Sequence, residues 1–125
     1  MQLLASNNVV PEAKKAAARR IVMEEDYVTS AQVLAEFYVN AVRKGEPPLP
    51  PDKARAWVQQ IARKPCAPIT PQLVQAAIAL SSRYKISYWD GAIIAAAERL
   101  GAKTLYSEDL AHGATYGSVS VTNPF

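Results

Sequence analysis

The chain has 125 residues, of which 50% are hydrophobic, so it fits one domain with a real core and is too short for two. Its 14 Lys and Arg against 11 Asp and Glu give a net charge of +3, which permits an anionic partner such as nucleic acid but falls short of a polybasic tail. The single cysteine excludes an internal disulfide, and no apolar run approaches the roughly 20 residues of a membrane span. We therefore expect one cytoplasmic domain over residues 1–125, without a membrane segment.

The first half of the chain predicts a helix, a strand and a second helix before a proline-rich loop. "PEAKKAAARRIVMEED" (11–26) has a helical apolar stripe behind a proline suited to the first turn. "DYVTS" (26–30) is short and β-prone, and Ser30 is placed to cap a helix over "AQVLAEFYVNAVRK" (31–44). "GEPPLPPD" (45–52) must be a loop, because its prolines remove backbone donors and fix φ.

The second half alternates helical and β-prone segments. The expected elements are helices at 53–64, at 72–84 and from Ser87 to Gly101, an extended piece at 65–70, and strands at 103–107 and 118–123. Strands that alternate with helices predict a largely parallel α/β sheet covered on both faces.

Three acids lie where such a sheet would bring them together. Asp90 is in the first turn of an otherwise apolar helix, Asp109 follows the strand 103–107, and Glu36 lies in the helix after 26–30. Ligands of open parallel sheets bind at the carboxyl ends of the strands. Converging carboxylates repel one another unless a cation neutralises them, and their hard oxygens suit Mg²⁺ or Mn²⁺. Such ions activate water for phosphodiester cleavage, which is nuclease chemistry.

Each acid also has a purely structural interpretation. Ser87 and Asp90 have the spacing of a capping box, in which the carboxylate stabilises the helix start. Asp109 fits a turn. Glu36 is harder to explain in this way, because it lies beside a core stripe, where a charge usually has a partner. Trp89, next to Asp90, is expected to pack in the core.

Longer stretches of the chain resemble a known family. "YKISYWDGAIIAAAERLGAKTLYSEDLAHGATYGSVSVTNPF" is similar to the C-terminal half of PIN-domain proteins of the VapC toxin type, in which a helix opening with "WDa", a strand ending in "SED" and a terminal "NPF" recur together. "TSAQVLAEFYVNAVRK" resembles the family's second block. The resemblance covers residues 10–125 and implies a PIN-like three-layer α/β fold, with a short, mainly parallel central sheet covered by helices and a strand order of 3-2-1-4-5.

The resemblance also implies a function. Members of the family are Mg²⁺- or Mn²⁺-dependent ribonucleases with four acidic positions around the metal. Carried over, these positions include Glu36, Asp90 and Asp109, and Ser107 matches a polar position beside the metal. The implied partners are an RNA substrate, a small antitoxin protein and a second copy of the chain, in a homodimer or larger assembly.

The first strand departs from the family pattern. Members begin with a central strand that ends in a metal-binding Asp, usually within "DTN", but this chain has no acid before Glu12. "MQLLASNN" resembles only the tail of that strand, with Leu3 to Ala5 at its end, so the first strand is expected to be truncated, and the gene product either begins upstream or lacks a ligand. Because a central strand cannot be left out of a buried sheet, residues 1–10 should shift into the gap, or a second chain should fill it.

Three functions stay open from the sequence. The first is a metal-dependent endoribonuclease toxin, impaired if the first acidic ligand is missing. The second is an inert PIN-like interaction protein that binds an antitoxin or dimerises. The third is an α/β module without nuclease activity, whose acids are all caps and turns.

Overall fold

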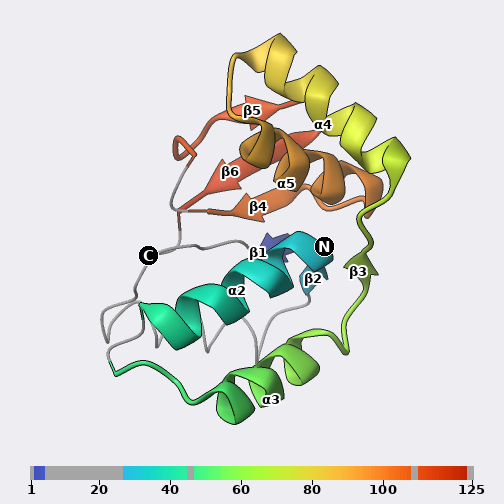
Figure 1. Ribbon diagram of the computed structural model, residues 1–125. Helices are drawn as coiled ribbons and strands as arrows, with labels where there is room; N and C mark the ends of the chain where they lie inside the picture. Colours follow the sequence, from blue (N-terminus) through green and yellow to red (C-terminus); the bar gives the residue numbers. More distant parts are fainter. Residues whose placement is uncertain (1, 5–26, 45–46, 108–109, 124–125) are drawn as a thin grey trace.

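The computed structural model describes residues 2–4, 27–44, 47–107 and 110–123, and its helices and strands alternate as predicted (Figure 1). The elements are β1 (Gln2–Leu4), β2 (Tyr27–Ser30), α2 (Ala31–Arg43), α3 (Pro51–Ile61), β3 (Cys66–Ala67), α4 (Pro71–Tyr84), α5 (Tyr88–Arg99), β4 (Thr104–Tyr106), β5 (Thr115–Tyr116) and β6 (Val119–Thr122). The predicted helix over residues 11–26 lies outside the described residues.

The strands form one sheet in the order β3-β2-β1-β4-β6-β5. All neighbours are parallel except β5 and β6, so the predicted mainly parallel α/β sheet is confirmed. The central place belongs to β1, which pairs with β2 on one side and β4 on the other. Residues 2–4 therefore occupy the centre of the sheet, which is the first of the two outcomes expected from the short N-terminal strand.

A short antiparallel edge strand was not predicted. The segment 108–117 carried no strand signal of its own, yet Thr115 and Tyr116 pair with Ser120 and Val119 as β5. The turn that joins β5 to β6 contains Gly117 with φ +60°, a left-handed conformation that two-residue hairpin loops require. The signal was thus the "YGS" turn rather than β propensity.

Side-chain caps set the starts of three helices. The hydroxyls of Ser30, Thr70 and Ser87 each accept a 3.1 Å hydrogen bond from the backbone N–H three residues later, at the starts of α2, α4 and α5. At the far end of α5, Gly101 has φ +72°, as expected for a residue that ends a helix.

The core lies between α5 and the sheet, and α4 packs against α5 (Figure 1). Every residue of α5 from Gly91 to Ala97 is buried. Some of these residues join β-strand side chains such as Val28, Leu105 and Val121 in one apolar cluster, and others join Leu73 and Ala77 of α4 in a second. A continuous apolar run in the sequence has therefore become the buried central helix.

The helices of the described residues are too short or too polar to cross a membrane.

Candidate functional site

The strand register aligns the carboxyl ends of the parallel strands at one edge of the sheet. Leu4 of β1 is opposite Tyr106 of β4, and Tyr106 is opposite Thr122 of β6. On the other side of the sheet, Ser30 at the end of β2 is opposite Ala67 of β3. The start of α2, which follows β2, and the segment that follows β4 therefore lie at the same edge of the sheet. Ligands of parallel sheets bind at this carboxyl edge.

Glu36 lies in α2, one turn after Gln32, and the two side chains are in contact. The Gln32 Nε2 amide donates to the Glu36 carboxylate at Oε1 over 3.2 Å. The same nitrogen donates to the backbone carbonyl of Trp89, in the first turn of α5, over 3.3 Å. One amide nitrogen thus bridges the Glu36 carboxylate and the backbone of the residue before Asp90, which ties α2 to the first turn of α5.

The second oxygen of the Glu36 carboxylate has no partner within the described part of the chain. Oε2 is buried and accepts no hydrogen bond from residues 2–4, 27–44, 47–107 or 110–123. Leaving a buried carboxylate oxygen unpaired costs roughly 1 to 3 kcal/mol, or more when it is charged, and a bound cation would remove that cost. A divalent ion bound at this oxygen would account for the buried carboxylate. The purely structural interpretation of Glu36 does not.

Asp90 has the spacing of a capping box but makes only half of one. Its backbone N–H donates to the Ser87 hydroxyl over 3.1 Å, which caps α5. Within the described part of the chain, no return bond joins the Ser87 N–H to the Asp90 carboxylate. The half-buried carboxylate of Asp90 is therefore not used by the cap, although the positive end of α5 stabilises its charge.

The segment after β4 carries the remaining candidates. Ser107 is only 3% exposed, and its N–H donates to the Thr122 carbonyl over 3.1 Å, which continues the β4–β6 ladder by one residue. Glu108 and Asp109 lie outside the described residues, so the predicted place of Asp109 is not tested. Among residues 2–4, 27–44, 47–107 and 110–123, no three His, Cys, Asp or Glu side chains gather closely enough to hold a metal.

The residue after the central strand is an alanine. β1 ends at Leu4, so Ala5 takes the chain position at which the resemblance implied a metal-binding Asp. The sequence therefore offers no acid directly after β1.

Two residues of the site were missed or misread from the sequence. Gln32 shares a helix face with Glu36, and this i to i+4 spacing was the signal for their contact. The expectation that Trp89 packs in the core is wrong, because its side chain is 63% exposed. It occupies the second position of α5, on the water-facing side of a helix whose burial begins at Gly91.

Other reactive groups do not enter this site. Burial raises the pKa of the Cys66 thiol in the edge strand β3, which makes it a poorer nucleophile. His112, the only histidine, accepts a 3.0 Å hydrogen bond at Nδ1 from the Asn123 backbone N–H. Both observations fit structural roles.

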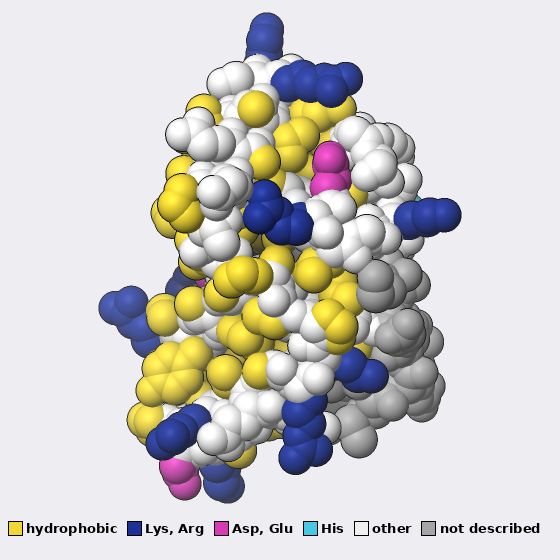
Figure 2. All heavy atoms as spheres, turned by 90° about the vertical axis from the view of Figure 1, so that its right-hand side faces the viewer, with side chains coloured by type: hydrophobic (Ala, Val, Ile, Leu, Met, Phe, Trp, Pro, Cys, Tyr) yellow, Lys and Arg dark blue, Asp and Glu magenta, His cyan; other side chains and the backbone are white. Residues whose placement is uncertain are grey.

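The chain carries a net charge of +3. The acids among the described residues are Glu36, Asp52, Asp90 and Glu98, and Lys and Arg outnumber them. Figure 2 shows Lys and Arg side chains spread over one face, around and among apolar side chains, with few acids between them. Such a surface attracts polyanions over a distance.

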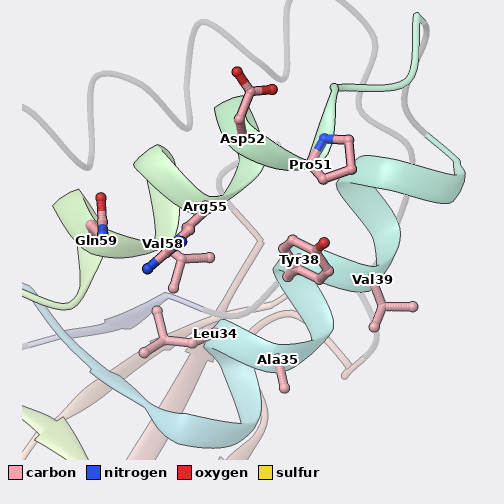
Figure 3. Close-up of a pocket in the computed structure, with 9 residues that line it drawn as sticks. All are labelled: Leu34, Ala35, Tyr38, Val39, Pro51, Asp52, Arg55, Val58 and Gln59. Carbon is pink, nitrogen blue, oxygen red and sulfur yellow. The ribbon is translucent and has the colours of Figure 1, made fainter.

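A separate groove of about 880 Å³ lies between α2 and α3. Leu34 and Tyr38 of α2 face Val58 and Arg55 of α3 across it, whereas Asp52 points away (Figure 3). Because these positions of α2 lie on the side of the helix opposite Glu36, the groove is distinct from the acidic edge.

The comparisons with known proteins identify the fold family. A family model of the PIN domain matches residues 7–116. The chain belongs to the PIN-domain family. Its structure is similar to the crystal structure of VapC20 from Mycobacterium tuberculosis, a sarcin-ricin loop cleaving toxin, with a TM-score of 0.65 and 19% sequence identity over 87% of this chain and 90% of that one. That likeness bears on the fold of this PIN domain. The search among curated proteins gave no match.

Proposed function

We propose that this PIN domain is a divalent-metal-dependent endoribonuclease of a toxin–antitoxin pair, weakened by the alanine that follows β1. Glu36, Asp90 and Asp109 would hold Mg²⁺ or Mn²⁺, and Ser107 would assist beside them. One observation carries the proposal. The buried Oε2 of Glu36 has no partner among the described residues, and Gln32 links the same carboxylate to the first turn of α5.

The chain's own residues have separate tasks in this proposal. Gln32 orients the Glu36 carboxylate, since one of its amide hydrogens is bonded to Oε1 and the opposite oxygen is left for a cation. The Ser87 cap fixes the start of α5 and hence Asp90. A bound Mg²⁺ or Mn²⁺ would supply an activated water and offset charge on the phosphate. Lys and Arg side chains raise the local concentration of RNA.

Ala5 is the reason to expect low activity. A site with three carboxylates instead of four offers less negative charge to a Mg²⁺ ion, which gives up its water ligands reluctantly. We expect weak metal binding and slow cleavage by the unaltered chain, in the cytoplasm, with a homodimer as the assembled form.

The decisive experiment restores the acid. Ala5→Asp should raise Mn²⁺-dependent cleavage of a mixed RNA substrate at least about tenfold, equal to roughly 1.4 kcal/mol of transition-state stabilisation. Adding Glu36→Gln to this variant should abolish the gain, whereas adding Asp52→Asn, a change to an acid in the first turn of α3, should not. Cleavage that ignores both Ala5→Asp and Glu36→Gln would refute the proposed site.

A second candidate function is that of an inert interaction protein. It is favoured by the alanine at the end of β1 together with the apolar groove between α2 and α3, which would receive a small antitoxin. In that case Ala5→Asp would leave the protein without nuclease activity, and Leu34→Glu, which places a charge in the groove, would abolish antitoxin binding without affecting the fold.

A further inference from the structure

Trp89 is the most exposed large apolar side chain among those of the described residues, at 63%. It is nevertheless held in place. Its ring meets that of Tyr88 edge to face, with centroids 5.0 Å apart and planes at 74°, and Tyr88 is itself packed against the α4–α5 cluster. A large aromatic ring is thus presented to solvent in contact with Tyr88, which is partly buried against the α4–α5 cluster.

The position of Trp89 ties it to the candidate acidic edge. Its backbone carbonyl accepts from the Gln32 amide that also holds Glu36, and Asp90 is the next residue. The backbone that carries the Trp89 ring is therefore part of the candidate acidic edge. Basic side chains precede it at the end of α4, where the Arg83 guanidinium lies 5.0 Å from the centre of the Tyr84 ring and Lys85 follows.

We propose that Trp89 is a stacking platform for an unpaired nucleobase of the RNA substrate, next to the phosphate that the acids engage. The inference rests on the proposed function and narrows its substrate class to RNA with an unstacked base, such as a single strand or a hairpin loop. Every base has a π face, so the platform tolerates different sequences, but bases within a duplex are already stacked on their neighbours. Trp89 selects for RNA structure rather than for one base.

The test uses tryptophan fluorescence and RNA affinity together. In a Glu36→Gln background, which should not cleave, Trp57→Phe leaves Trp89 as the single tryptophan of the chain. Binding of a hairpin RNA should quench its emission, and a blunt duplex of matched length should not. Trp89→Leu should weaken hairpin binding roughly 5- to 100-fold, and Trp89→Phe much less, since base stacking on an aromatic ring contributes about that much.

The matched control is Ile69→Ser, which removes a 60% exposed apolar side chain from the loop before α4. It should leave RNA affinity unchanged. The stacking role would be overturned if hairpin and duplex quenched the emission equally, or if Trp89→Leu left the hairpin affinity unchanged. It would also be overturned if Trp89→Leu lowered the mass measured by analytical ultracentrifugation, because Trp89 would then belong to a protein interface. If Ala5→Asp still raises metal-dependent cleavage in those cases, the proposed function stands without the stacking role. If Ala5→Asp gives no such rise, the proposed function itself is refuted, whatever the result for Trp89.

Discussion

The two helices that carry Glu36 and Asp90 have the same kind of N-terminal cap but differ in how much of each helix is buried. α2 and α5 both start at a serine cap, at Ser30 and Ser87. α5 is buried over seven consecutive residues, and Gly91 brings it so close to α4 that a Cβ atom there would lie 2.6 Å from the Ala77 carbonyl oxygen. α2 buries only Gln32 and Val33, and its acid is held by one polar contact.

This difference separates stability from the candidate chemistry. The position of Asp90 is set by apolar packing of the whole helix, so changes that disturb it should unfold the protein. The orientation of Glu36 is set by Gln32, so changes there should affect a bound ion while the fold stays intact. Variants of the two helices can test this separation.

The largest effect is expected from Gly91→Ala. In an exposed helix this change would stabilise the protein by about 1 kcal/mol, because alanine is the better helix former. Here the added methyl group collides with the backbone of α4, and the free energy of unfolding should fall by about 3 kcal/mol. Thermal denaturation should show a melting temperature lower by roughly 10 °C. An unchanged or raised melting temperature would show that α4 and α5 are not packed so closely.

On α2, Gln32→Leu keeps the size of the side chain and removes its amide. Mn²⁺ affinity should fall roughly 10- to 100-fold, as it does when a residue that orients a metal ligand is lost, and the melting temperature should change little. Isothermal titration calorimetry measures the affinity. Gln75→Leu, on the exposed side of α4, is the matched control and should leave it unchanged. A large loss of stability with no loss of affinity would reverse the roles given to the two helices.

The two caps give a smaller and directly matched comparison. Ser30 is 1% exposed, so Ser30→Ala leaves the Val33 N–H without a partner in a dry place and should cost about 2 kcal/mol. Ser87 is exposed, so water can replace its hydroxyl, and Ser87→Ala should cost about 0.5 to 1 kcal/mol. Urea denaturation of both variants measures the difference. Equal costs would mean that burial of the α2 cap contributes nothing.

The sequence predicted the fold better than the site, for physical reasons. Caps and apolar periodicity are local, so the starts of α2, α4 and α5 were predictable, and the family resemblance supplied the order of the central strands. The strand β5 depends on a glycine turn that pairs it with β6, and this pairing is not visible in either strand alone.

The details of the site depend on contacts between distant segments. Glu36 and Asp90 could be picked out from the sequence as candidate acids, but the hydrogen bond from Gln32 to the Trp89 carbonyl joins residues 57 positions apart. Trp89 is exposed because another side of α5 faces the sheet. The sequence "GAIIAAA" is apolar on all sides, so it does not predict which side of the helix is buried. Whether Asp109 joins the two other acids stays a prediction.

The most direct test of the central claim is a calorimetric titration of Mn²⁺ into the unaltered chain, Glu36→Gln, Asp90→Asn and Asp52→Asn. If the unpartnered oxygen of Glu36 marks a cation site, the unaltered chain and Asp52→Asn should bind one Mn²⁺ weakly and with equal affinity, and both Glu36→Gln and Asp90→Asn should lose the binding heat. Tight binding that survives Glu36→Gln and Asp90→Asn would contradict the account, because the ion would then be held elsewhere in the chain.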